Sequence, residues 1–175
     1  MNSNLSYKGV VTLATKLGDK TIEKKVYNNG TNLLFELYAR ALAGQQVSLL
    51  IPSYIDVGGV RDIDGVDIYE SHTKESLPVI VTYLDKVRAD EGGYSYGVPF
   101  TRVEAILTRN MFNEYLGDNT KVIRLMSSDN RELALVNVED LGNTIKTLIA
   151  GTQMIVVWDL YVTNKEQNTT TGGNI

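Results

Sequence analysis

The chain has 175 residues, of which 43% are apolar and 22% are charged, with a formal net charge of −4. These values are typical of one globular domain and exclude a globally disordered chain. Cysteine is absent, which excludes disulfides, thiol nucleophiles and zinc sites built on cysteine.

The charge balance gives no bulk attraction to nucleic acid, so we expect no nucleic-acid partner. The densest basic cluster is Lys20, Lys24 and Lys25, which we interpret as a solvated hairpin face. The polar N-terminus, residues 1–8, predicts no signal peptide. No apolar run approaches the length of about 18 residues that a membrane helix needs, so no membrane partner is expected.

Strand signals dominate the chain. Residues 7–15 and 21–27 are rich in Val, Thr, Ile and Tyr and flank Gly18-Asp19, which predicts a β-hairpin. A strand is expected over residues 47–57, split at Pro52 or placed at a sheet edge because proline cannot donate to the ladder. The Gly- and Asp-rich residues 58–73 predict a long loop. Further strands are expected over residues 77–87, 99–111, 121–126, 132–138 and 151–164.

One amphipathic helix is predicted near residues 32–43. Apolar side chains recur at helical spacing, with Leu33 and Leu37 among the expected core residues. Thr31 or Asn32 can cap its first turn, and Gly44 can end it. Residues 140–150 fit either a short helix or a strand.

The sum is a mainly β protein, a β-sandwich of jelly-roll-like or immunoglobulin-like type. Residues 1–164 form a single β-rich domain in this interpretation, and the polar residues 165–175 form a flexible C-terminal tail. Trp158 lies mid-strand between Val156 and Leu160, which favours a core anchor over a ligand platform.

No residue pattern indicates catalysis, a cofactor or a metal. His72 is the only histidine and lies in a polar segment without a nucleophile motif, so we expect it to be exposed. Asp62, Asp64 and Asp67 could offer oxygens to calcium, but the spacing of Gly65 departs from the calcium-loop pattern, which favours a solvated acidic loop.

One loop is a candidate for binding a partner or a ligand. Tyr94 and Tyr96 lie among Gly92, Gly93 and Gly97, a composition that binding loops share. These rings can stack on a sugar or a partner chain, or they can fold back onto the sheet.

Four stretches carry a family resemblance: NNGTNLLFELYARALAG (28–44), PSYIDVG (52–58), SSDNRELAL (127–135) and GTQMIVVWDLYVTN (151–164). In order and spacing they resemble small structural proteins of tailed-phage virions. The resemblance covers about a third of the chain and implies a β-sandwich that assembles in copies on a head, neck or tail.

The first functional hypothesis is therefore a virion component, assembled in the host cytoplasm, whose partners are copies of itself and other virion proteins. We expect residues 5–16 or the Pro52 strand to supply a sheet edge for this assembly. The alternative is a carbohydrate-binding module that uses the Tyr94–Tyr96 loop, or the acidic loop of Asp62, Asp64 and Asp67 with calcium. A small hydrolase with two carboxylates is the third and weakest hypothesis.

Overall fold

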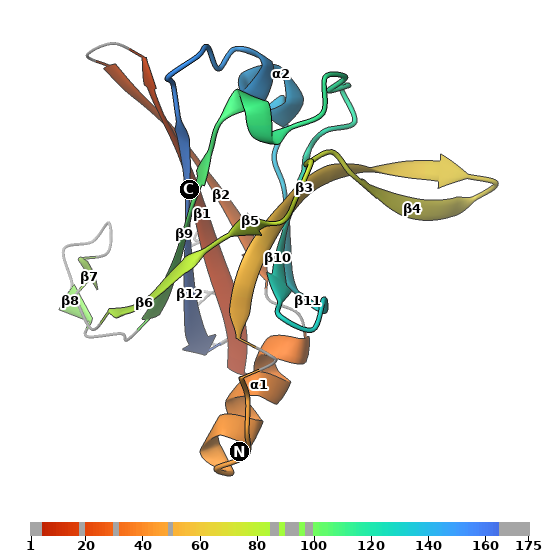
Figure 1. Ribbon diagram of the computed structural model, residues 1–175. Helices are drawn as coiled ribbons and strands as arrows, with labels where there is room; N and C mark the ends of the chain where they lie inside the picture. Colours follow the sequence, from red (N-terminus) through yellow and green to blue (C-terminus); the bar gives the residue numbers. More distant parts are fainter. Residues whose placement is uncertain are drawn as a thin grey trace, which may run out of the picture.

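The computed structural model describes residues 5–17, 20–29, 32–48, 51–84, 88–89, 95–96 and 100–164 (Figure 1). Two antiparallel sheets pack against each other, which confirms the predicted mainly β sandwich. The first sheet has the strand order β2 (Lys20–Asn29), β1 (Leu5–Leu17), β12 (Met154–Asn164), β9 (Phe100–Leu107) and β6 (Ile80–Leu84). The second has the order β11 (Glu132–Asn137), β10 (Val122–Ser127), β3 (Pro52–Ile63) and β4 (Val66–Ser71), with β5 (Leu77–Pro78) also on β3. A separate pair joins β7 (Arg88–Ala89) to β8 (Ser95–Tyr96).

The first hairpin forms as the sequence predicts. β1 and β2 pair antiparallel, with Val11 opposite Val26. Strand β1 is central because it also pairs along its length with β12. Strand β2 also comes close to β11 of the second sheet. There Lys24 donates a hydrogen bond of 2.8 Å to the carbonyl of Glu139, which follows β11.

The predicted loop over residues 58–73 is wrong. Strand β3 continues to Ile63, turns at Asp64 and Gly65, and returns as β4. Both turn residues have positive φ, +54° and +79°, the backbone that a tight hairpin turn requires and that an Asp-Gly pair favours. The same Gly and Asp content that suggested a loop therefore makes a hairpin turn.

The expected interruption at Pro52 is also wrong. Pro52 is the first residue of β3, a strand position that proline tolerates. Strand β3 is an inner strand, since β10 pairs with it on one side and β4 and β5 on the other. Strand β1 is an inner strand, and β3 is an inner strand as far as Gly58, so the edges expected at residues 5–16 and at Pro52 are not found there. The sheet order instead ends at β2 and β6, and at β11 and β4.

Helix α1 (Asn32–Leu42) confirms the predicted amphipathic helix. It ends at Gly44, whose φ is +68°, while the amide of Gln45 donates to the Arg40 carbonyl. The ambiguous residues 140–150 contain a second, short helix, α2 (Leu141–Lys146), with Leu141 and Ile145 buried. A 3₁₀ turn, η1 (Arg109–Met111), follows β9. In the described part of the chain, no helix is long and apolar enough to cross a membrane.

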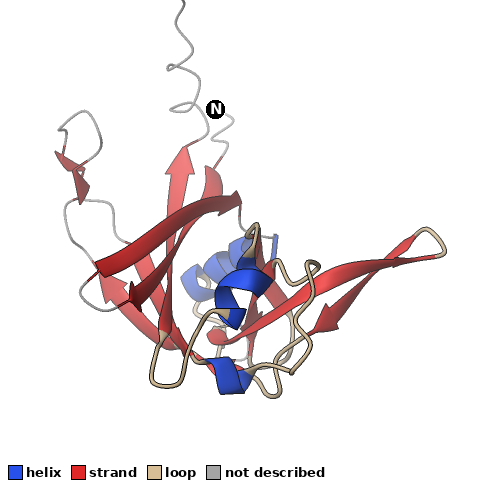
Figure 2. Ribbon diagram, turned by 90° about the horizontal axis from the view of Figure 1, so that it is seen from above, coloured by secondary structure: helices blue, strands red, loops and turns tan. Residues whose placement is uncertain are grey.

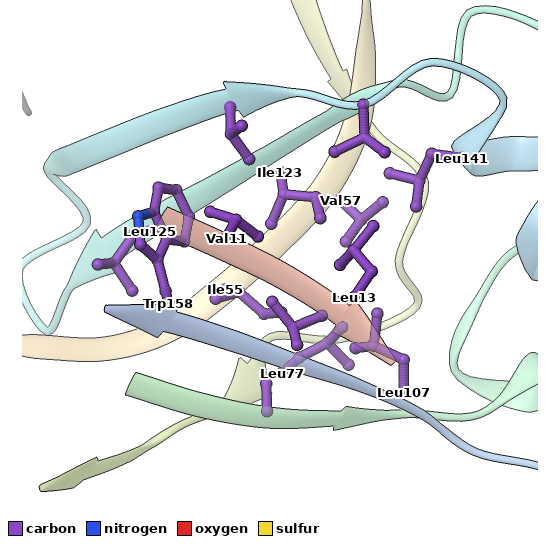
Figure 3. Packing of buried hydrophobic residues seen from close by; sticks show 14 of the residues in the cluster. Val11, Leu13, Ile55, Val57, Leu77, Leu107, Ile123, Leu125, Leu141 and Trp158 are labelled. Atoms are coloured by element: carbon purple, nitrogen blue, oxygen red, sulfur yellow. The ribbon is translucent and has the colours of Figure 1, made fainter. Parts of the chain in front are cut away.

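One buried apolar cluster joins the two sheets, and Figure 3 shows most of its members. Trp158 has no solvent exposure, which confirms it as a core anchor. Leu37 packs partly buried against this cluster. Leu33 belongs to α1, but its side chain lies outside the described part of the structure, as do residues 165–175 of the predicted tail.

Candidate functional site

The predicted binding loop falls largely outside the described residues. Tyr94 lies outside the described residues, and Tyr96 is described only as the second residue of β8. The side chains of both tyrosines are therefore undescribed, and their role as a partner or ligand loop stays a prediction.

The prediction of an exposed His72 is wrong, because its residue exposure is only 7%. Its Nδ1 lies 2.8 Å from the Thr120 hydroxyl, and its amide donates to the Val57 carbonyl at 2.8 Å. The carbonyl of His72 accepts a hydrogen bond from Asn113. The histidine thus ties the end of β4 to the segment before β10, a structural role that its polar sequence neighbours concealed.

No catalytic triad forms around this histidine. The adjacent Ser71 donates its hydroxyl proton to Asp56 at 2.5 Å, whereas the His72 ring contacts Thr120. A triad requires the imidazole to lie between the hydroxyl and the carboxylate. Here serine and carboxylate contact each other directly, and the imidazole does not lie between them.

The acidic residues 62–67 lie at the tip of the β3–β4 hairpin. The carboxylate of Asp62 accepts a hydrogen bond of 2.7 Å from the Gly65 amide, and Asp62 faces Asp67 across the two strands. Within the described ranges, no three His, Cys, Asp or Glu side chains gather where they could hold a metal ion. The Asp62 carboxylate thus stabilises the hairpin turn by accepting the Gly65 amide.

This hairpin projects away from both sheets (Figures 1 and 2). Strand β10 pairs with β3 only as far as Gly58, so the rest of β3 is paired with β4 alone. We call residues 59–71 the arm. In the sheet order β4 is terminal, and the backbone of the arm is therefore open along both of its edges.

One face of the arm is apolar. Cross-strand partners point to the same side of a sheet, and Ile63 is opposite Val66 while Arg61 is opposite Ile68. Ile63, Val66 and Ile68 are 45%, 60% and 46% exposed. An ion pair of 3.0 Å between Arg61 and Glu70 closes this face toward the sandwich.

This apolar face continues the buried side of β3. Ile55 and Val57 point into the core, and strand alternation puts Gly59, Arg61 and Ile63 on the same side. The side of β3 that faces the core therefore continues beyond the sandwich into the arm. There, no part of the described chain covers it. Sequence reasoning missed this surface because it read the segment as a loop.

A polar cluster fixes the root of the arm. Asp56 is buried and accepts hydrogen bonds from Ser71 at 2.5 Å, Thr73 at 2.9 Å and Arg124 at 3.0 Å. The Arg124 guanidinium stacks 3.5 Å from the centre of the Tyr69 ring. Burial, together with the nearby Asp56 charge, raises the pKa of the Tyr69 hydroxyl well above its usual range. These contacts join β3, β4 and β10 where the arm leaves the sandwich.

Two open grooves lie side by side, and both are lined by residues 149–152. One has a volume of about 630 Å³ and also contacts Lys74, Arg109 and Phe112. The second, about 580 Å³, is bounded by Ala14, Lys16, Thr21 and Ile155, and we call it the β1 groove.

Searches of protein-family models, of curated proteins and of solved structures found no match to this chain.

Proposed function

We propose that the chain is a structural component of a tailed-phage virion, assembled in the host cytoplasm, and that it works by docking to copies of itself and to other virion proteins. The observation that carries this proposal is the arm. A hairpin that extends an apolar sheet face into solvent needs a partner to cover that face.

The polar side chains near the arm support a structural role. Among the described residues, Ser71, His72 and Asp56 bring a hydroxyl, an imidazole and a carboxylate near one another, and each is engaged in contacts that hold strands together. Because these three polar side chains are engaged in internal contacts, we expect the fold to act through its surface.

The virion assignment draws on the resemblance. Three of the four resembling stretches meet at one end of the second sheet. The Tyr54 hydroxyl donates a hydrogen bond of 2.9 Å to the Asn130 side chain. The Ser128 hydroxyl donates to the carbonyl of Ser48, which follows α1 in the chain. Helix α1 itself packs on β11. The resemblance therefore follows one packed unit of the fold, which supports a shared structural purpose.

Mass spectrometry of particles purified from the phage or prophage whose genome encodes the chain tests the proposal. We expect the chain in stoichiometric amounts in particles, retained after a density gradient and a high-salt wash. Absence from intact particles contradicts it. A glycan array with the purified chain tests the carbohydrate-binding alternative separately.

A further inference from the structure

The arm is acidic as well as apolar. Residues 59–71 contain Asp62, Asp64, Asp67 and Glu70 against Arg61 alone, a formal charge of −3. The apolar side chains of Ile63, Val66 and Ile68 share one face, while Asp62 and Asp67 alternate onto the opposite face. A matching acceptor must offer an apolar floor and a positive rim.

The β1 groove has these properties. Ala14, Ile149 and Ile155 supply apolar lining, and Ile149 and Ile155 are 71% and 39% exposed. The exposed Lys16 borders the groove. On the face of β1 and β2 that bears Ala14 and Lys16, the register also places Lys25 and Glu23, a formal charge of +1. Lys24 lies on the opposite face, where it donates to the Glu139 carbonyl. Apolar surface and charge sign therefore both complement the arm.

The two surfaces lie on opposite sides of the molecule. In Figure 1 the arm projects to the right and the paired ends of β1 and β2 lie at the upper left. About five residues of β3 extend past Gly58, a reach of roughly 17 Å at 3.3 Å per residue. An arm that leaves the sandwich in the opposite direction cannot fill the groove of its own chain.

We propose that the arm of one copy docks in the β1 groove of the next copy, head to tail. This inference rests on the proposed function and names the partner and the acceptor surface. A head-to-tail contact leaves one arm and one groove free in every pair, so it generates a ring or a filament. A two-fold pairing of arms is disfavoured because it brings together two tips that each carry Asp62, Asp64 and Asp67.

Complementation between two damaged copies tests the direction of the contact. Ile68→Asp places a charge on the apolar face of the arm, and Ile149→Asp places an acid in the groove. Each variant alone should lose self-association by on the order of 10- to 100-fold, from the lost burial of one aliphatic side chain. Ile80→Asp is the matched control, because Ile80 is an exposed isoleucine on β6, away from both surfaces.

The two variants mixed together should form a heterodimer, since one keeps its groove and the other keeps its arm. Sedimentation velocity or mass photometry measures the assembly, and circular dichroism verifies that each variant is folded. Charge reversal gives an independent test. Asp64→Lys and Lys16→Glu should each weaken association several-fold, and the double variant should recover it.

A wild-type chain that stays monomeric at about 1 mM overturns the inference. So does a folded Ile68→Asp variant that assembles like wild type, or a mixture that fails to form the heterodimer. If the chain is a particle component yet the mixture fails, the arm inference falls and the proposed function stands. If the mixture assembles but the particles lack the chain, only the virion assignment falls.

Discussion

The buried carboxylate at the arm root gives a quantitative test of the fold. Asp56→Ala removes the acceptor for Ser71, Thr73 and Arg124. Breaking a buried ion pair by deleting one partner costs about 3–5 kcal/mol. The Arg124 side chain keeps 22% exposure and retains Glu132 at 3.8 Å, which offsets part of that cost. We therefore expect a loss of about 2–4 kcal/mol in the free energy of unfolding.

Urea unfolding followed by tryptophan fluorescence measures this loss, because Trp158 is the single tryptophan and is buried. Asp67→Ala is the control, an exposed arm acid that should change stability by less than about 0.5 kcal/mol. In a double-mutant cycle, Arg124→Met added to Asp56→Ala should cost less than the sum of the two single changes. A single-variant loss below about 1 kcal/mol, or strict additivity, would refute the ion pair as the fastening of the arm.

Three further changes probe the core, the backbone packing and the pH response. Trp158→Ala should cost about 3–5 kcal/mol by circular dichroism in urea, and a loss below about 1 kcal/mol would mean that the indole is not packed. Gly59→Ala should lower the Tm in calorimetry, because the added Cβ overlaps the backbone carbonyl of Asn119, which cannot rotate away; an unchanged Tm would place that backbone elsewhere. Burial raises the pKa of the Glu132 carboxyl despite the nearby Arg124. Folding therefore favours its protonated form, and its ionisation costs stability above the pKa of the unfolded chain. Glu132→Gln should raise the Tm at pH 7, and the gain should vanish below the usual carboxyl range. A gain that persists there contradicts the ionisation argument.

The elements that the sequence predicts well are those whose signal is local. Alternation with a mid-strand Trp158 was sufficient to predict β12 and its buried face. The helical spacing of Leu33 and Leu37, with Gly44 as a stop, was sufficient to predict α1. In these segments the periodicity of the side chains and the packing of the fold agree.

The misses depend on contacts that are distant in sequence. Residue composition could not reveal that His72 turns inward, because its partner Thr120 lies 48 residues away. The burial of Asp56 likewise depends on Arg124, which is 68 residues distant. The arm is different, because Asp64-Gly65 between Ile63 and Val66 is a local hairpin signal. That signal was available and was outweighed by the high Gly and Asp content around it.

The rigid root of the arm bears directly on assembly. A two-stranded hairpin is marginally stable by itself, and ordering it only upon docking would subtract from the binding free energy. Asp56, Arg124 and Tyr69 hold both strands of the arm to β10 before any partner arrives. The exposed Ile63, Val66 and Ile68 are then presented in a fixed geometry, so that little of their burial energy is spent on ordering. The polar cluster at the arm root thus prepares the apolar face of the arm for docking. This role explains why a buried ion pair lies in the second sheet at the point where the arm begins.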